Sequence, residues 1–211
     1  MKKNRCVIVS AGPVQLQMKT WLRPETDYII ACDAGLRNCE KLCVTPDLVI
    51  GDFDSAPNPG QGNIIVLPHE KDDTDTHYAA KAAIREGYAE VLMLGALGGA
   101  RLEHMLANLA TGLWLEKQGA NVVIADEKSR ITFLKPHSTR CYTGDKYFYF
   151  SLFPAEKSAD DICIKGAAYP LNHAVLNADY PLGISNEYRD KAAEISVGSG
   201  FLMVVETIRD L

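Results

Sequence analysis

The chain has 211 residues, of which 47% are hydrophobic and 23% are charged, and its net charge is −5. Such a composition is typical of a globular protein with one large domain or two small ones. The acidic balance supplies no basic surface for nucleic acid, and no apolar run approaches the roughly 18 residues of a membrane span. We therefore expect neither nucleic acid nor a membrane as a partner.

The N-terminal segment is basic and then apolar, but its apolar run, Cys6–Ser10, is too short for the core of a signal peptide. This short run predicts a first strand instead, and we expect a cytoplasmic protein. The six cysteines include no C-x-x-C pair. Cys39 and Cys43 lie four apart on an expected helix, without an evident second pair of zinc ligands. We expect reduced, mostly buried thiols and no structural zinc.

Residues 1–128 alternate short apolar runs with segments of helical period, which is typical of a parallel α/β sheet. Near-continuous runs of Val, Ile and Leu predict strands that are covered on both faces. The expected strands are Cys6–Ser10, Tyr28–Cys32, Leu48–Ile50, Ile64–Leu67, Val91–Leu94 and Val122–Ala125.

Two segments between these strands have a helical pattern, Thr74–Arg85 and Glu103–Gln118. Thr74 or Asp73 can cap the first helix at its N-terminus. A glycine follows each segment and can adopt the left-handed conformation that ends a helix. Leucines recur at helical spacing in the second segment, and we expect this stripe to face the sheet: Leu102, Leu106, Leu109 and Leu113.

Residues 129–211 show short apolar runs separated by Pro, Gly, Asn and Asp, with no helical period of useful length, which predicts a smaller all-β unit. The expected fold is α/β, with a Rossmann-like parallel-sheet domain at residues 1–128 and an all-β, sandwich-like domain at residues 129–211. The strands expected in the second domain are Ile131–Leu134, Lys146–Phe153, Asp161–Ile164, His173–Leu176, Ala193–Val197 and Phe201–Glu206.

Acidic residues follow two of the expected strands, where ligands of open α/β sheets bind. Asp33 follows the second strand, and its sequence context allows either a helix cap or a ligand contact. Asp52 and Asp54 follow the third strand and precede Ser55. In an extended segment these two carboxylates point the same way, and such a pair favours a hard cation such as Mg²⁺. An acidic surface turn is the alternative.

A third acidic segment, Lys71-Asp72-Asp73-Thr74-Asp75, lies directly before the first predicted helix. Helix capping and the helix dipole explain one or two of its acids. They do not explain Lys71, which suits a phosphate beside a bound metal.

A glycine-rich turn, Gly95–Gly99, precedes the second predicted helix and can present backbone N–H groups to an anion. It matches neither the P-loop nor the dinucleotide fingerprint. Arg101, His104 and Asn108 continue from it as one polar stripe. His69, His77, His137 and His173 lack such a context, and we expect them to be structural or exposed.

Taken in order, these segments resemble the thiamine pyrophosphokinase (thiamine diphosphokinase) family over nearly the whole chain. The resemblance is carried by the segments Asp33–Gly35, Pro46–Ser55, Lys71–Asp75, Gly95–Asn108, Gly166–Leu171 and Gly183–Glu187. In two positions the chain departs from the family's Gly-Gly-Arg-x-Asp-His pattern, with Ala100 for the second Gly and Glu103 for Asp.

The resemblance implies an enzyme that transfers a diphosphate group from ATP to the hydroxyl of thiamine, giving thiamine diphosphate and AMP. It implies Mg²⁺ as cofactor, ATP and thiamine as small-molecule substrates, and a homodimer with thiamine near the subunit interface. The residues that it and the motifs point to are Asp52, Asp54 and Asp75 for Mg²⁺; these with Asp72 and Arg101 for catalysis; Asp33, Gly35, Ser55, Lys71, Gly98, Gly99, Arg101, His104 and Asn108 for ATP; and Ser185, Asn186 and Tyr188 for thiamine.

Three other functions keep part of this pattern. A different Mg²⁺-dependent diphosphotransferase or kinase would keep the acidic residues but change the pocket around Ser185. A phosphohydrolase would use water as nucleophile, and a non-catalytic nucleotide-sensing module would bind ATP without consuming it.

Overall fold

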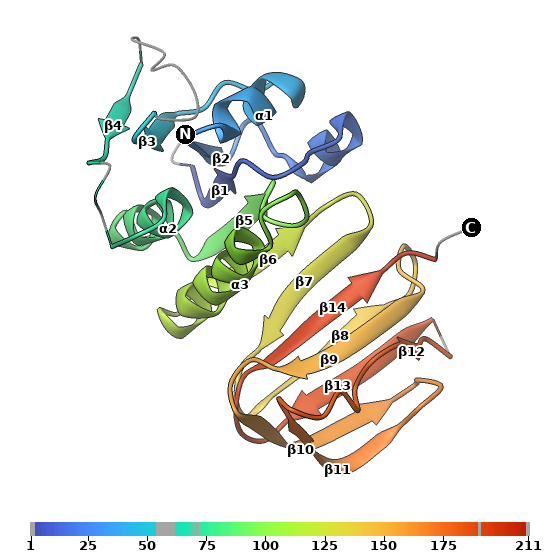
Figure 1. Ribbon diagram of the computed structural model, residues 1–211. Helices are drawn as coiled ribbons and strands as arrows, with labels where there is room; N and C mark the ends of the chain where they lie inside the picture. The colour runs from blue at the N-terminus through green and yellow to red at the C-terminus, as the bar shows by residue number, and fades with distance from the viewer. Residues whose placement is uncertain (1–2, 54–61, 69, 71, 190, 210–211) are drawn as a thin grey trace. The chain divides into compact units, whose positions relative to one another are not determined.

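The computed structural model describes residues 3–53, 62–68, 70, 72–189 and 191–209. The chain divides into two compact units, residues 1–127 and residues 128–211 (Figure 1). The first contains β1 (Arg5–Val9), the 3-10 helix η1 (Leu16–Trp21), β2 (Asp27–Cys32), α1 (Gly35–Lys41), β3 (Leu48–Gly51), β4 (Ile64–Val66), α2 (Asp75–Arg85), β5 (Glu90–Leu94), α3 (Leu102–Lys117) and β6 (Asn121–Ala125).

Within the first unit the strands pair in the order β6-β5-β1-β2-β3-β4, and all these pairs are parallel. All six strands expected there are present, within a few residues of the predicted ends. Both predicted helices are also present, and Gly87 and Gly119 have the expected left-handed φ of +79° and +94°. The sequence patterns did not reveal η1, and they indicated α1 only as a helix around Cys39, without its bounds.

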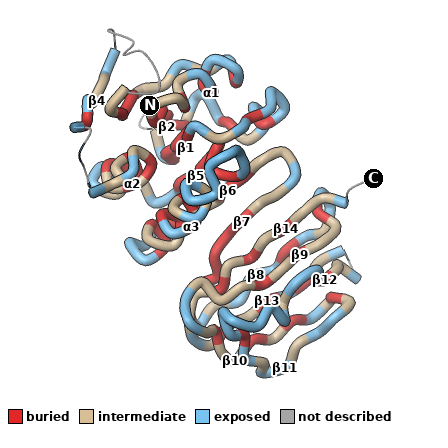
Figure 2. Tube along the Cα trace, viewed as in Figure 1, coloured by how far each residue is buried: buried red, intermediate tan, exposed pale blue. Residues whose placement is uncertain are grey.

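Helices cover both faces of this sheet (Figure 1). The helix α2 packs on β1, β2 and β3 with α3 beside it, while α1 contacts β1 and β2. One face of the sheet forms a buried cluster with η1 and α1 that includes Val7, Val9, Met18 and Leu42. The strand β1 is buried along its whole length (Figure 2), as a strand between two neighbours and two layers of helix must be.

The predicted leucine stripe of α3 is wrong. Leu102 and Leu106 are 63% and 55% exposed, while the buried residues of the helix are Asn108, Thr111, Gly112, Leu115 and Glu116. Small and polar residues on this face allow close packing, and Asn108, Thr111 and Glu116 each take part in a hydrogen bond with another segment. For example, the Asn108 amide donates to the Ala96 carbonyl at 2.9 Å. Polar partners on neighbouring elements therefore decided the orientation of the helix, which leucine spacing alone does not reveal.

The cysteines are free thiols, but only three of the six are buried: Cys6, Cys32 and Cys39. The expectation of mostly buried thiols is thus half right. The helix expected to carry both Cys39 and Cys43 ends at Lys41, and Cys43 follows it with a φ of +54°.

The second unit contains only strands among its described regular elements: β7 (Ser129–Leu134), β8 (Ser138–Thr143), β9 (Tyr149–Pro154), β10 (Ser158–Lys165), β11 (Leu171–Asn177), β12 (Asn186–Glu187), β13 (Ala192–Val197) and β14 (Leu202–Thr207). They pair antiparallel in the orders β12-β9-β14-β7 and β11-β10-β13-β8. The strands β8 and β12 were not expected from the sequence.

Both strand sets of the second unit contribute to one buried apolar cluster. Phe150 and Leu152 of β9 alternate with less buried neighbours, and Ile162 and Ile164 of β10 do the same. This two-residue period is what a sheet with one buried face requires. No helix in the described part of the chain has the length and hydropathy needed to cross a bilayer.

A buried ion pair fixes the start of β1 to the start of β2. Asp27 is fully buried and Arg5 is 8% exposed. The Asp27 carboxylate accepts hydrogen bonds from Arg5 Nε and Nη2, both at 2.8 Å, and from the backbone N–H of Arg23 at 2.6 Å. Each buried charge is thereby neutralised and hydrogen-bonded, which burial of a charge requires.

We predict that Asp27→Asn destabilises the first unit by about 3 kcal/mol, because it leaves a buried guanidinium without its counter-charge. The control Glu90→Gln breaks an exposed pair with Arg23 and should cost under about 1 kcal/mol. Urea unfolding followed by tryptophan fluorescence measures this, since Trp21 and Trp114 both lie in the first unit. Equal midpoints for the two variants would contradict the prediction.

Candidate functional site

The carboxyl ends of the parallel strands meet at one edge of the first unit's sheet, and most of the predicted ATP and metal residues follow those strands. The strand order changes direction between β1 and β5, because β2, β3 and β4 continue on one side and β6 on the other. Ligands of open α/β sheets bind in the crevice at such a point.

The segments that follow β1 and β5 contact each other directly. The backbone N–H of Gly12 donates to the carbonyl of Gly95 at 2.8 Å. A Cβ at Gly12 would lie 2.5 Å from that oxygen, and one at Gly95 would lie 2.4 Å from the carbonyl oxygen of Ser10. The Asn38 amide donates to the carbonyls of Ser10 and Gly12, both at 2.7 Å. These contacts fix the two segments side by side.

The glycine-rich turn reaches the surface beyond this contact. Gly98 and Gly99 are exposed and have φ values of +68° and +88°, which favour glycine. Ala100 is not among the residues with positive φ, so alanine is accommodated there. The hydrogen bond from Asn108 to the carbonyl of Ala96 attaches the turn to α3. Asn108, predicted as an ATP ligand, therefore supports the turn.

Asp33 follows β2 in a left-handed conformation, with a φ of +46°. It does not cap α1, whose N-cap is Ala34 without a side-chain hydrogen bond. The backbone N–H of Asp33 donates to Ile50 O at 2.8 Å. A Cβ at Gly51 would lie 3.1 Å from the Cα of Asp33, so the ends of β2 and β3 are in close contact.

Gly35, also predicted as an ATP residue, has a packing role in the structure. It is buried, and a Cβ there would lie 2.0 Å from the carbonyl oxygen of Val9. Any side chain would push α1 away from the end of β1.

The start of α2 lies beneath the end of β2. Thr74 is the N-cap, as expected, and its hydroxyl accepts from the N–H of His77 at 3.1 Å. Asp75 is in the first turn of the helix, and its backbone carbonyl accepts from the Cys32 thiol at 3.7 Å. Burial and then the charge of Asp75 raise the pKa of Cys32. Asp75 therefore lies beside Cys32, the residue directly before Asp33.

The other residues of the acidic segment differ in environment. Both carboxylate oxygens of Asp73 accept from Lys81 Nζ, at 2.9 and 2.7 Å, whereas Asp72 is exposed. Asp52 is half-buried directly after β3. The predicted residues Asp54, Ser55 and Lys71 lie outside the described part of the chain.

The donor atoms at this edge are carboxylate oxygens, which suit a hard cation such as Mg²⁺. Oδ1 of Asp33 and Oδ1 of Asp75 are buried, on elements that are in contact. Carboxylates at the ends of two strands and a helix can hold one cation together with substrate phosphates, so these residues fit the metal that the family resemblance implies.

Arg101 is the N-cap of α3, and its side chain is 69% exposed. Its Nε donates to Glu103 at 2.7 Å. This hydrogen bond lowers the pKa of Glu103. Glu103, which departs from the family pattern, is thus the partner of the Arg101 guanidinium. His104 is exposed one turn away, with its Nε2 3.9 Å from Glu103.

In the second unit, the residues predicted to bind thiamine have different environments. Ser185 is exposed, with a φ of +55°, and its N–H donates to the hydroxyl of Ser151 at 2.9 Å. Asn186 is 5% exposed. Its amide accepts from Tyr169 N and donates to Tyr169 O, at 3.0 and 2.7 Å. Asn186 therefore holds the strand end, while Ser185 is open to a ligand.

Tyr188 packs against Phe150, with 4.9 Å between ring centroids. Its hydroxyl donates to Glu206 at 2.7 Å, and burial followed by the Glu206 charge raises its pKa. Glu206 is fully buried and accepts from Arg130 Nε at 2.6 Å. The Tyr188 ring is thus part of the unit's own packing.

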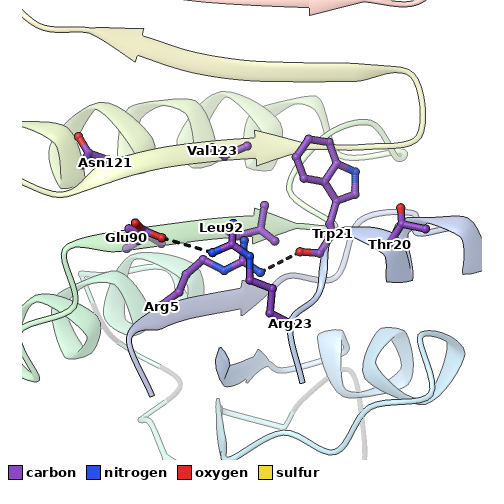
Figure 3. A pocket seen from close by; sticks show the side chains of 9 residues that line it. Arg5, Thr20, Trp21, Arg23, Glu90, Leu92, Asn121 and Val123 are labelled. Carbon is purple, nitrogen blue, oxygen red and sulfur yellow. Dashed lines mark hydrogen bonds and ion pairs between the residues drawn. The ribbon is translucent and has the colours of Figure 1, made fainter. Parts of the chain in front are cut away.

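Two cavities in the described part of the first unit have no predicted site residue in their lining. One, of about 320 Å³, lies at the amino ends of β1, β5 and β6 (Figure 3). In it Arg5 Nη2 donates to the carbonyl of Trp21 at 2.8 Å. The other, of about 270 Å³, includes Tyr28 and Tyr88, whose rings stack at 5.5 Å. The carboxyl edge, which carries the acidic groups, is the better candidate site.

Comparison with known families identifies the family of the chain. The model of the thiamin pyrophosphokinase catalytic domain matches residues 20–124, and that of the thiamin pyrophosphokinase vitamin B1 binding domain matches residues 137–202. The chain belongs to the thiamin pyrophosphokinase family. The prediction of this family, and of an ATP-dependent diphosphotransferase, is confirmed.

Solved structures of thiamin pyrophosphokinases have the same fold. The enzyme from Bacillus subtilis matches with a TM-score of 0.88 at 23% identity, over 98% of this chain and 100% of that one. The enzyme from Geobacillus thermodenitrificans matches with a TM-score of 0.84 at 25% identity, over 98% of both chains. Yeast thiamin pyrophosphokinase matches with a TM-score of 0.78 at 12% identity, over 99% of this chain and 87% of that one. The predicted mixed α/β class is thereby confirmed.

A search of curated proteins finds no significant match.

Two residues that support this edge were not found from the sequence. Asn38 fixes the segment after β1, and Thr76 shares a 2.9 Å hydrogen bond with Ser10. The Gly12 contact could have been suspected, because a glycine follows a predicted strand. A single asparagine or threonine on a helix carries no comparable signal.

His77 connects α2 to α3 behind this edge. Its Nδ1 and the Thr111 hydroxyl are 3.1 Å apart, and its ring lies edge-on to Trp114 at 4.9 Å. Burial lowers the pKa of His77 below its ordinary value of 6.5, against the charge of Asp73, while Lys81 lowers it further. The folded state therefore favours the neutral ring.

We predict that the first unit loses stability as the pH falls below about 6.5, because the unfolded chain then binds a proton that folded His77 resists. The loss begins at the unfolded pKa and stops growing below the lower folded pKa. Urea unfolding by tryptophan fluorescence from pH 8 to 5 should show a shallower pH slope in His77→Gln. The control His104→Gln, at an exposed site, should keep the native slope, and identical slopes in all three proteins would contradict the prediction.

Proposed function

We propose that the chain transfers the diphosphate group of ATP to the hydroxyl of thiamine at the carboxyl edge of the first unit's sheet. The observation that carries this proposal is the convergence of Asp33, Asp75 and the glycine-rich turn on that edge. In this proposal residues 1–128 form a Rossmann-like ATP and Mg²⁺ domain. Residues 129–211 form a sandwich-like thiamine domain.

We propose Asp52, Asp54 and Asp75 as the residues that hold Mg²⁺, with Asp72 beside them. Bound Mg²⁺ would neutralise charge on the phosphates, which otherwise repels an attacking oxygen. Asp75 has the best support, because its position in the first turn of α2 places it next to the end of β2. Asp33 is the neighbouring carboxylate at the strand end.

The reaction requires the thiamine hydroxyl to attack the β-phosphorus of ATP while AMP departs from the opposite side. Arg101 is proposed to turn from Glu103 to the phosphates, since its side chain is exposed at the start of α3. The backbone of Gly98 and Gly99 would receive phosphate oxygens at the positive end of that helix. Lys71 adds a second cation. Either Asp72 or Asp54 accepts the hydroxyl proton.

For thiamine, we propose Ser185 as the contact residue, supported by its exposure and by the hydrogen bond that fixes its backbone. Asn186 and Tyr188 would shape the pocket indirectly, because their polar groups bind Tyr169 and Glu206. A homodimer with thiamine near the interface remains part of the proposal. The six free thiols fit a reducing, cytoplasmic compartment.

We predict that Asp75→Asn lowers kcat at least about a hundredfold, or roughly 2.7 kcal/mol of transition-state stabilisation. The reason is the loss of one anionic ligand at the metal edge. The matched control Asp73→Asn, two residues away but paired with Lys81, should stay within about tenfold.

The measurement is AMP release from ATP and Mg²⁺, with and without thiamine. Thiamine-dependent AMP from the native chain supports the proposed reaction. ADP or phosphate released without thiamine would overturn it. Equal losses in the two variants would remove Asp75 from the metal site but leave the reaction in place.

We predict that Ser185→Ala raises the KM for thiamine about fivefold, as expected for one lost neutral hydrogen bond, and leaves the KM for ATP within about twofold. Ser199→Ala is a suitable control, because Ser199 is an exposed serine of the same unit whose hydroxyl donates to Asp160. Steady-state kinetics with each substrate varied in turn gives both constants. A parallel rise in both KM values would exclude a specific contact with thiamine.

A further inference from the structure

The outer face of β10 and β11 carries a second group of side chains of the types that can bind a metal ion. It differs from the acidic edge because it offers sulfur and nitrogen atoms as well as oxygen. Asp161 and Cys163 lie two apart on β10, and His173 lies on β11. One ligand atom from each residue lies within 4.8 Å of the other two. A carboxylate oxygen, a thiol sulfur and an imidazole nitrogen therefore share one small region.

The strand register explains why these three side chains meet. Ile162 pairs with Ala174, and Ile162 is fully buried in the core. Side chains alternate along a strand, so Asp161 and Cys163 lie on the opposite, outer face. His173, next to Ala174 on the partner strand, lies on that face as well, and it is exposed.

Two of the three residues have a backbone conformation that residues other than glycine rarely adopt. Asp161 has a φ of +56° and His173 a φ of +51°, and the β10–β11 pairing is irregular on both sides of Ile162. Such bulges turn individual side chains to new directions. Here the result is direct contact between Asp161 Oδ1 and His173 Nδ1.

Neighbouring groups hold this arrangement. The backbone N–H of His173 donates to Cys163 Sγ at 3.4 Å. A Cβ at Gly198 would lie 2.6 Å from the Cβ of Asp161, so the absence of a side chain at position 198 makes room for the carboxylate. An exposed His–Asp pair alone would need neither the thiol nor this packing.

We propose that Asp161, Cys163 and His173 bind a transition-metal ion of the zinc class, with solvent completing the coordination. Sulfur, nitrogen and oxygen together favour Zn²⁺ and similar ions, whereas Mg²⁺ requires oxygen ligands. Binding replaces the thiol proton of Cys163 with the metal and releases that proton to solvent. The ion would link β10 to β11 across the irregular pairing.

The test is Co²⁺ titration of the full-length, reduced chain without a histidine tag, because Co²⁺ reports a thiolate ligand by a sulfur-to-metal charge-transfer absorption. We expect one equivalent of Co²⁺ to produce this absorption, and Zn²⁺ but not excess Mg²⁺ to remove it. Cys163→Ser should abolish the absorption. His173→Gln and Asp161→Asn should each weaken binding by at least about tenfold.

Two matched variants control for other ligands. Cys141→Ser removes an exposed thiol of the same unit, and His137→Gln removes an exposed histidine that also has a positive φ, +56°. Both should retain the absorption, and circular dichroism verifies that each variant is folded. The proposal is overturned if the native chain gives no thiolate absorption, or if Cys163→Ser keeps it. Neither outcome depends on whether the chain transfers diphosphate.

Discussion

Backbone-to-backbone contact at the carboxyl edge of the parallel sheet is the constraint on which the first unit depends. At Gly12, Gly35 and Gly95, a Cβ would lie 2.5 Å or less from a carbonyl oxygen of a neighbouring segment. Because these residues have no side chain, the ends of β1 and β5 can touch, and α1 can begin directly against β1. Burying so many peptide groups together is tolerated only when their donors and acceptors are paired. Asn38 supplies part of that pairing through its two hydrogen bonds to carbonyl oxygens after β1.

The chemical character of the edge follows from this close packing. Asp33 approaches Gly51 because β2 and β3 end side by side. Asp75 lies close to the same edge because the start of α2 packs beneath Cys32. Like charges brought together in this way repel, and a cation or a cationic side chain must offset the repulsion. For Asp73 this cation is Lys81, which forms an ion pair with it. Asp33, Asp52 and Asp75 bring further carboxylates to the same edge, and under the proposed function their oxygens would hold a hard cation together with the phosphates of ATP.

Much of this could be predicted from the sequence, because strands covered on both faces give continuous apolar runs and acids after such runs mark the functional edge. The parallel strands and both long helices follow from that pattern, whereas the family resemblance depends on specific motifs and their order along the chain. The failures share a cause. Leu102 and Leu106 have the spacing of a buried stripe, yet the opposite face of α3 is buried because Asn108 and Thr111 have partners on other elements. Spacing along one chain does not encode which polar side chain will find a partner far away in sequence. For the same reason, Asn38 gave no signal.

In the second unit too, the sequence does not reveal which polar side chains of a motif have partners elsewhere in the fold. Ser185, Asn186 and Tyr188 are close in sequence, so the family resemblance places all three at the thiamine pocket. The structure separates them by environment: the Asn186 amide is bound to the backbone of Tyr169, and the Tyr188 hydroxyl to a buried Glu206 that also binds Arg130. A side chain whose polar group is already bound in the interior contributes little further energy to a ligand, because each new contact would require an existing hydrogen bond to break. In the proposed thiamine pocket, Asn186 and Tyr188 would therefore act through the shape and rigidity of the segment, and direct polar recognition would fall to Ser185, which is exposed.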